Sequence, residues 1–356
     1  MKGPARVIPQ IVNMESLWDK AFMALLSSFT QEQARLLINL RQQYEVWIEA
    51  ERRWQRLPYD LRRKQVSGHS YLYEITGRNG NGRSLGAWSD ALEARFNAYR
   101  EDKAALRDRR ERSRTALDET ARLARALRVP MAANEAGAIL READRRGLLD
   151  GPLMVVGTNA VTAYALEAGG FIRMLPEETA DFDLAWADTQ AHEDEQILWD
   201  MLKAVDPTFT VNTERTFQAR NARAYEVEIL AAPSRIATMA RTDRPRPVPL
   251  PEQEWLLEGK AVDQVIICRD GSPARIVAPD PRWFALQKLW MADQPKRNPL
   301  KRDKDRAQGT LLLDAVAEAM PHYPLDEAFE AGLPGELAPY FVHWSERRPA
   351  PPAPTW

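Results

Sequence analysis

Two aspartates separated by a single residue form the most distinctive polar pattern in the chain. Asp181 and Asp183 flank Phe182 in the segment DFDLAW, whose short apolar run is typical of a β-strand. Side chains two residues apart in a strand point to the same face, so both carboxylates would project together while Phe182 and Leu184 enter the core. Adjacent like charges repel unless a cation lies between them, and Mg²⁺ prefers one or two carboxylates together with phosphate oxygens. The pair predicts a magnesium site, with the wet face of an edge strand as the alternative.

A glycine turn precedes this pair along the chain. Gly157, Thr158 and Asn159 follow the apolar segment LMVV and open an Ala-rich helical segment. Glycine lets the backbone approach a ligand closely, and the Thr158 hydroxyl and the start of the helix can hold a phosphate. Strand–glycine–helix junctions are also common without any ligand, so this motif indicates a phosphate site only in combination with the two aspartates.

A second acidic strand is expected further along the chain. Glu226 and Glu228 alternate with apolar residues in the segment YEVEI. Either one could supply a third carboxylate if this strand lies beside the strand of Asp181 and Asp183. Such a carboxylate could hold metal or take a proton from an attacking hydroxyl.

Positive charge gathers in the segment from Arg282 to Arg306, which holds eight Lys and Arg against three Asp and Glu. Lys288 stands in an otherwise apolar helical segment that Asp280 is expected to cap. Lys288 and Lys304 could neutralise a bound triphosphate, with a solvated basic loop and helix start as the alternative. The same set includes Lys301, Arg302 and Arg306.

The elements that must position these residues alternate between short apolar strands and helices from Leu153 onward. This alternation predicts an α+β fold with a mixed sheet and flanking helices. A hairpin is expected around residues 269–272, and a last helix over about Asp303 to Met320.

The first 130 residues are expected to be mainly helical, with a short strand and a Gly-rich loop. Thr30 and Gln33 form a capping-box pattern, and Ser89 is a second cap. The expected elements are helices at Glu15–Phe29, from Thr30 to about Arg56 and from Asp90 to Arg128, and a strand at Tyr71–Ile75. We therefore expect three parts: residues 1–130, an α+β domain at 131–322, and a segment at 323–356 that ends in a Pro-rich tail.

Three other features are assigned structural roles. The segment from Gly77 to Ser84 approximates a phosphate-binding P-loop, but no helix is expected after it, so a hairpin loop is expected. Arg78 and Arg83 of this loop could still reach a phosphate or an acidic group of the substrate. His192 is expected to be a solvated residue in the first turn of a helix. Cys268 lies in an apolar strand and is expected in the core.

Composition limits the classes of protein that fit. The chain of 356 residues has 49 Lys and Arg against 51 Asp and Glu, for a net charge of −2, which argues against a generally basic nucleic-acid binder. One Cys and four His exclude a disulfide framework and make a His- or Cys-based metal centre improbable. The sequence contains no apolar run long enough for a membrane span and no convincing signal peptide, so a cytoplasmic setting is expected.

The order of these motifs resembles the nucleotidyltransferase superfamily, whose fold is polymerase-beta-like. A closer resemblance, over about residues 151–320, is to a bacterial family of nucleotidyltransferase-fold proteins of uncharacterised substrate. It is carried by the segments VVGTNAVTAYALEAGG, ETADFDLAW, AYEVEIL and PDPRWFALQKLWMADQPKRNPLKRDKDRAQ.

This resemblance implies an enzyme that moves a nucleotidyl group from a nucleoside triphosphate, with Mg²⁺, to the hydroxyl of a protein, an RNA or a small molecule. Asp181, Asp183 and Glu228 match the metal and catalytic positions, and Gly157 and Thr158 match the phosphate motif. Glu228 stands where relatives usually have Asp, and its extra methylene changes the reach of the carboxylate. This departure leaves an alternative: a catalytically weak module that acts through a protein or nucleic-acid partner. The helical region could form a dimer, dock on the domain or grip the substrate.

Overall fold

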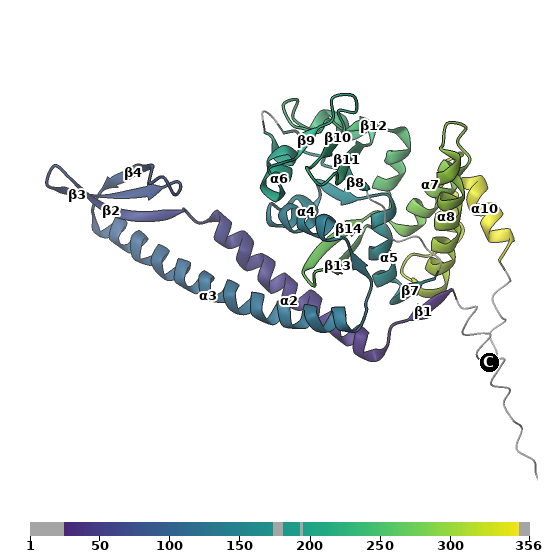
Figure 1. The fold of residues 1–356 in the computed structure, drawn as a ribbon, viewed down its shortest axis with the longest axis horizontal. Helices are drawn as coiled ribbons and strands as arrows, with labels where there is room; N and C mark the ends of the chain where they lie inside the picture. Colours follow the sequence, from purple (N-terminus) through teal and green to yellow (C-terminus); the bar gives the residue numbers. More distant parts are fainter. Residues whose placement is uncertain (1–24, 174–180, 193–194, 349–356) are drawn as a thin grey trace, which may run out of the picture.

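The computed structural model describes residues 25–173, 181–192 and 195–348. They form a body and a long arm that projects from it (Figure 1). The expected helix at Glu15–Phe29 lies mostly outside the described residues. Its last part is wrong, because β1 (Leu26–Ser28) is a strand that pairs antiparallel with β7 (Gly170–Ile172).

Two long helices form the shaft of the arm. α2 (Gln31–Arg56) begins with the expected capping box of Thr30 and Gln33, and α3 (Asp90–Ala126) begins at the expected cap, Ser89. The 37 residues of α3 give it a length of about 55 Å. The helices lie side by side and run in opposite directions, because the chain turns back at the tip of the arm (Figure 1).

A three-stranded antiparallel sheet forms this tip. Its strands are β2 (Asp60–Val66), β3 (His69–Ile75) and β4 (Gly82–Ala87), in that order. The sequence predicted only β3, together with a loop that covers part of β4. Leu61 and Leu72 pack with Tyr99 of α3 in a small core of their own.

Apolar contacts dock the arm on the body. Leu40, Tyr44 and Trp47 of α2 share a buried cluster with Val265 and Ile267 of the body. Part of the apolar surface that could have formed a dimer is therefore covered by the chain itself. Dimerisation stays a prediction.

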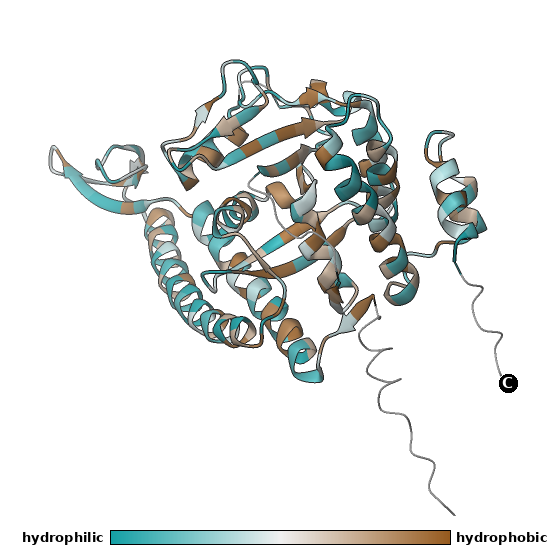
Figure 2. Ribbon diagram, turned by 45° about the vertical axis from the view of Figure 1, so that its right-hand side comes forward, coloured by the Kyte–Doolittle hydropathy of each residue, from teal (hydrophilic) through white to brown (hydrophobic). Residues whose placement is uncertain are grey.

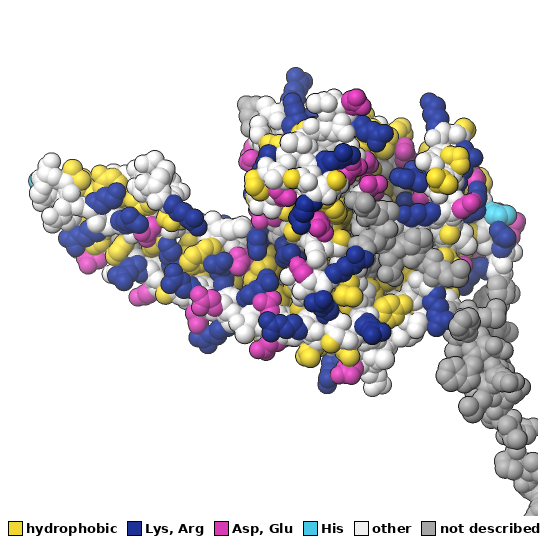
Figure 3. Space-filling view, in the orientation of Figure 1, with side chains coloured by type: hydrophobic (Ala, Val, Ile, Leu, Met, Phe, Trp, Pro, Cys, Tyr) yellow, Lys and Arg dark blue, Asp and Glu magenta, His cyan; other side chains and the backbone are white. Residues whose placement is uncertain are grey.

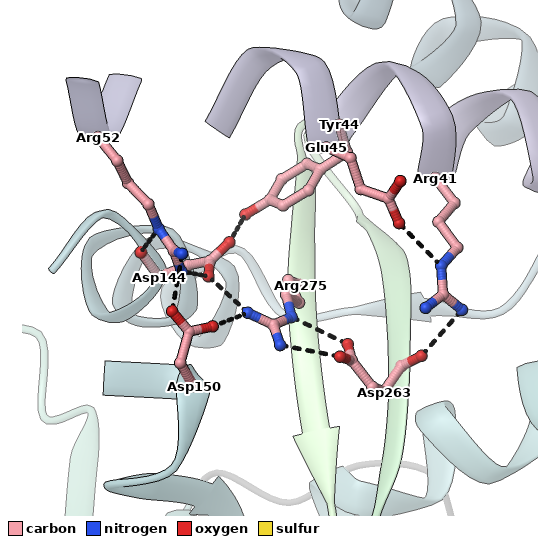
Figure 4. A network of polar contacts seen from close by, with 8 residues as sticks. All are labelled: Arg41, Tyr44, Glu45, Arg52, Asp144, Asp150, Asp263 and Arg275. Atoms are coloured by element: carbon pink, nitrogen blue, oxygen red, sulfur yellow. Dashed lines mark hydrogen bonds and ion pairs between the residues drawn. The ribbon is translucent and has the colours of Figure 1, made fainter. Parts of the chain in front are cut away.

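A buried ion network joins the same surfaces. Asp144, with no exposed surface, accepts hydrogen bonds from Tyr44 (2.8 Å), Arg52 (2.6 Å) and Arg275 (3.1 Å). Figure 4 shows Arg52 and Arg275 converging on Asp144 and on the neighbouring Asp150. The network ties α2 to the body through charged side chains as well as through apolar ones.

A mixed sheet forms one layer of the body, as the sequence predicted for an α+β fold. Its main path runs β6–β8–β11–β10–β9, and β12 pairs with β11. β8 and β11 are parallel, and the other neighbours on this path are antiparallel. The strands are β6 (Leu153–Val155), β8 (Asp181–Trp186), β9 (Thr210–Val211), β10 (Gln218–Arg220), β11 (Glu226–Ala231) and β12 (Val248–Pro249).

A second sheet contains the expected hairpin. β13 (Val262–Cys268) and β14 (Pro273–Ala278) pair antiparallel, and β5 (Met131–Ala132) adds to β13 in parallel. Cys268 is fully buried in it, as expected. The helices along this part of the chain are α4 (Asn134–Arg145), α5 (Val161–Glu167) and α6 (Ile197–Val205).

Four helices complete the body: α7 (Pro281–Ala292), α8 (Pro299–Ala319), α9 (Glu327–Ala331) and α10 (Ala338–Glu346). Asp280 caps α7 as expected, whereas α8 begins before Asp303 because Asn298 caps it. The strands of the body are largely hydrophobic and the arm helices mostly hydrophilic (Figure 2). None of the helices in the described part of the chain has the length and apolar character that a membrane span requires.

Candidate active site

Asp181 and Asp183 lie on one face of β8, as the sequence predicted. Both aspartates are half-buried. Phe182, which lies between them, and Leu184, which follows them, point into the core and are buried. The alternation of the strand thus brings two carboxylates to the same side of the sheet.

Glu228 lies directly beside this pair. The parallel register of β11 against β8 sets Glu228 opposite Asp183 and Glu226 opposite Asp181. Burial raises the pKa of Asp183; Lys288 opposes this shift and the charge of Asp181 adds to it. Burial also raises the pKa of Glu228, and the charges of Asp183 and Asp181 act in the same direction. The three acids therefore form one interacting group that a cation would stabilise.

Gln218 of β10 fixes the position of Glu228. Its side-chain amide donates to Glu226 (2.8 Å) and to Glu228 (3.1 Å), and its oxygen accepts from Asn212 (2.8 Å). Gln218 is only 2% exposed, so these contacts hold it firmly. No local sequence pattern marks this residue, because only the pairing of β10 with β11 brings it to Glu228.

Gly157 brings the turn after β6 against the aspartates. Its φ is +68°, and an added Cβ would overlap the Asp183 carboxylate. Thr158, buried, accepts a hydrogen bond from Gln308 (3.4 Å). The Asn159 side chain donates to the backbone oxygen of Asp181 (2.8 Å), so it supports the strand.

Lys288 contributes positive charge to the site, and the neighbouring Asp305 holds it in place. Lys288 of α7 is 5% exposed, and its Nζ lies 3.3 Å from Asp305 of α8. Asp305 also accepts from Arg297 (2.6 Å), which the sequence analysis did not single out. Burial lowers the pKa of Lys288 and of Lys304, and the charge of Lys288 lowers that of Lys304 further.

The basic segment divides into two groups. Lys288, Arg297, Lys301 and Lys304 line a pocket together with the acids. Arg302 instead donates to backbone oxygens of Gln294 and Pro295, and Arg306 pairs with Asp293 and Asp303. Helical periodicity separates the α8 members of the two groups, because Lys301 and Lys304 share one face of the helix and Arg302 and Arg306 lie on another.

We name this hollow the carboxylate pocket. Its volume is about 390 Å³, within the range of small-molecule sites. Gly157, Thr158, Asp181, Asp183 and Glu228 line one part of it. The four cations of the α7–α8 segment line another, and its apolar lining includes Phe217, Leu230, Val248, Leu250 and Met291. Asn159 and Glu226 do not line it.

The donor atoms of the pocket fit magnesium chemistry. Within the described ranges, no three His, Cys, Asp or Glu side chains form a complete metal cage. Mg²⁺ rarely uses one, since it binds through one or two carboxylates, waters and substrate phosphates. Asp181 and Asp183 are hard oxygen donors on one face, so they suit a Mg²⁺ ion that binds together with a phosphate ligand.

His192 lies elsewhere and outside any helix. α6 begins only at Ile197, so the expected first-turn position is wrong. The ring contacts Asp188 (2.7 Å) and Glu195 (3.1 Å) and lines a larger hollow of about 840 Å³. That hollow shares no lining residue with the carboxylate pocket.

Comparison with known proteins gives a family match and one structural match. A nucleotidyltransferase family model matches residues 134–333, a range that includes the whole carboxylate pocket and excludes the arm. A structural match is the crystal structure of an antigenic nucleotidyltransferase-like protein from Paracoccidioides brasiliensis, whose sequence is 15% identical to this one. The match covers 54% of this chain and 90% of that chain, with a TM-score of 0.26. No curated protein matches the chain. Since the family model spans more than half of its residues, the chain belongs to the nucleotidyltransferase family.

Proposed function

We propose that the protein transfers a nucleotidyl group from a nucleoside triphosphate to an acceptor hydroxyl, with Mg²⁺ as cofactor. One observation carries the proposal: acids from two parallel strands and four cations from the α7–α8 segment line the same pocket. A triphosphate with its metal needs both kinds of group within reach. The adjacent parallel acidic strands also support a polymerase-beta-like arrangement of the sheet.

The chemistry assigns a role to each group. The acceptor oxygen forms a bond to the α-phosphorus while the bond from that phosphorus to its bridging oxygen breaks, and pyrophosphate leaves with the electron pair. Glu228 takes the proton of the attacking hydroxyl. Lys288, Arg297, Lys301 and Lys304 stabilise the negative charge that develops on pyrophosphate.

The remaining groups bind and orient. Asp181 and Asp183 hold Mg²⁺, which when bound polarises the phosphate oxygens as a Lewis acid. The turn at Gly157 and the Thr158 hydroxyl contact the phosphates. Gln218 keeps the Glu228 carboxylate directed toward the pocket.

Isothermal titration calorimetry tests the binding step. ATP, GTP, CTP and UTP are titrated in turn into the protein with Mg²⁺, and at least one should bind. Asp181→Ala/Asp183→Ala should weaken this binding at least tenfold. The matched control is Asp108→Ala/Asp118→Ala, two aspartates of α3 that pair with Arg112 and Arg114 and do not line the pocket, which should bind as wild type does. Failure of the wild type to bind any of the four nucleotides would contradict the proposal.

Turnover separates an enzyme from the binding-module alternative. Incubation with cell lysate and α-labelled nucleotide, followed by mass analysis, should show which molecule gains the nucleotidyl group. Glu228→Asp should keep or raise the rate, because the carboxylate remains, whereas Glu228→Gln should lower it roughly 10²- to 10⁴-fold. Absence of turnover in both the wild type and Glu228→Asp, with nucleotide binding intact, would favour the binding module instead.

A further inference from the structure

One stretch of the arm carries positive charge that acidic side chains neutralise only in part. Residues 52–64, RRWQRLPYDLRRK, contain six Lys and Arg against a single acid. The exposed or half-exposed members Arg53, Arg56, Arg62, Arg63 and Lys64 are named the basic band. The band follows the last turn of α2 into β2, and so runs from the body toward the tip of the arm (Figure 1).

Acidic partners are scarce along the band. Arg62 pairs with Asp60 (2.7 Å). Across residues 25–173, 181–192 and 195–348, the structure shows no ion pair for Arg53, Arg56, Arg63 or Lys64. Arg63 and Lys64 instead lie over aromatic rings, those of Trp88 (4.4 Å) and Tyr73 (5.0 Å). Their charges remain available to an anionic partner.

The shaft of the same arm behaves differently. Figure 3 shows Lys and Arg side chains along the whole arm, interspersed with acids over the shaft. Four arginines of α3 are each matched by an acid: Arg109 by Glu49, Arg110 by Glu51, Arg112 by Asp108 and Arg114 by Asp118. These four shaft arginines thus have neighbouring acids, whereas in the described part of the chain Arg62 is the one member of the band with an ion-pair partner.

Aromatic rings accompany the band. Arg62 is paired with Tyr73 and Lys64 with Tyr71 in the register of β2 and β3, so these side chains share one face of the tip sheet. The opposite face carries Leu61 and Leu72, which pack toward α3, and also Arg63, which is paired with Leu72. Tyr71 and Tyr73 are partly exposed on the face that they share with Arg62 and Lys64. Tyr59, between the two halves of the band, is 48% exposed.

The inner end of the band borders a cleft. Arg53 and Arg56 line a hollow of about 460 Å³ between α2 and the strands β13 and β14. Charged residues on an edge strand such as β2 also prevent unwanted strand pairing. That role does not account for Arg53 and Arg56, which belong to a helix.

We propose that the basic band binds a single strand of nucleic acid. Unpaired Arg and Lys side chains would contact successive phosphates, and the exposed Tyr rings would stack on bases. A single strand fits better than a duplex, because stacking on protein rings requires unpaired bases. This surface lies outside the matched family region, and its binding does not require the transfer reaction.

Fluorescence anisotropy tests the surface without added nucleotide. The probes are a labelled RNA of about 20 nucleotides and the DNA of the same sequence, both single-stranded. Arg53→Gln/Arg56→Gln/Lys64→Gln should weaken binding at least tenfold. It should also flatten the dependence of log K on log salt by about 0.7 for each phosphate that the variant no longer neutralises. Tyr59→Leu should weaken binding without changing that slope, because a stacking interaction releases no counterion.

The matched control is Arg109→Gln/Arg112→Gln on the shaft, which should bind the probe as the wild type does. Circular dichroism melting should show that all variants are folded, and nucleotide titration should be unchanged in the band variant. Failure of the wild type to bind the probe at about 50 mM salt, where phosphate contacts are strong, would overturn the proposal. An equal loss of probe affinity in the shaft control would also overturn it. So would displacement of the probe by polyglutamate as readily as by unlabelled RNA. The nucleotide titration would stand or fall independently of these results.

Discussion

Gly157 lies so close to Asp183 that the turn has no room for a side chain. Two requirements meet at this position: a left-handed backbone, with φ at +68°, and direct contact with a carboxylate of the pocket. Gly169 has the same φ, but an added Cβ there would meet nothing within 4 Å. Gly157 also has ψ at −160°, a backbone region that essentially only glycine adopts, so strain and contact act together there.

Gly157→Ala should therefore cost more than Gly169→Ala. Strain alone should lower the free energy of unfolding by about 1 kcal/mol at Gly169. The glycine-only backbone of Gly157 and the overlap with Asp183 should together bring the loss there to about 2–4 kcal/mol, and nucleotide binding should weaken with it. Urea unfolding and calorimetry of both variants check this. Equal losses of stability would show that the contact with Asp183 has no cost of its own.

His192 provides a pH-dependent contribution to stability outside the pocket. Partial burial acts to lower the pKa of His192, but Asp188 and Glu195 outweigh it and raise the pKa above its ordinary 6.5. The pKa of Asp188 is lowered, since hydrogen bonds outweigh its partial burial, so this partner is ionised near neutral pH.

A raised histidine pKa means that the folded state holds the proton more tightly. The stabilisation is fully present below pH 6.5 and is lost as the pH rises through the raised pKa. The free-energy difference between wild type and His192→Gln should be about 1 kcal/mol or less, because the pair is partly solvated. Unfolding at a series of pH values from about 5 to 9 should show that difference shrinking. A constant difference would contradict the ion pair.

At the scale of elements, predictions from local sequence were confirmed where one residue type decides the outcome. Thr30, Ser89 and Asp280 mark helix starts because their side chains accept backbone hydrogen bonds within a turn. β2 was missed because its charged sequence, DLRRKQV, lacks the apolar alternation of a half-buried strand. The register that sets Glu228 beside Asp183 joins strands more than forty residues apart, so no local pattern contains it.

α6 shows a cap that local sequence also hides. Asp243, distant in sequence and 1% exposed, accepts hydrogen bonds from the backbone nitrogens of Leu198 (2.9 Å) and Trp199 (3.0 Å) at the start of the helix. Asp243→Ala should lower the free energy of unfolding by about 1–2 kcal/mol, because these donors lose their acceptor. Asp243→Asn retains one acceptor oxygen and should cost less. Chemical denaturation of both variants measures the order, and a reversed order would contradict the capping role.

For the whole molecule, the arm's attachment determines where the basic band lies relative to the carboxylate pocket. Apolar residues of α2 pack on β13, while Arg52 of α2 and Arg275 of β14 meet at the buried Asp144. Hinge motion of the arm would pull Arg52 away from the buried Asp144, and a buried charge that loses its partners is costly. The network therefore favours an arm held in one orientation.

Asp144→Ala tests this attachment directly. It removes the shared acceptor of Tyr44, Arg52 and Arg275, and should lower the free energy of unfolding by about 3–5 kcal/mol. Asp150→Ala is the matched control, because its carboxylate contacts the same two arginines but is 47% exposed, so its loss should stay below about 1 kcal/mol. Hydrogen exchange should accelerate in α2 of the Asp144 variant before it does in β8 and β11, since the arm loosens first. Unchanged exchange in α2, or equal losses in the two variants, would mean that the apolar cluster alone holds the arm.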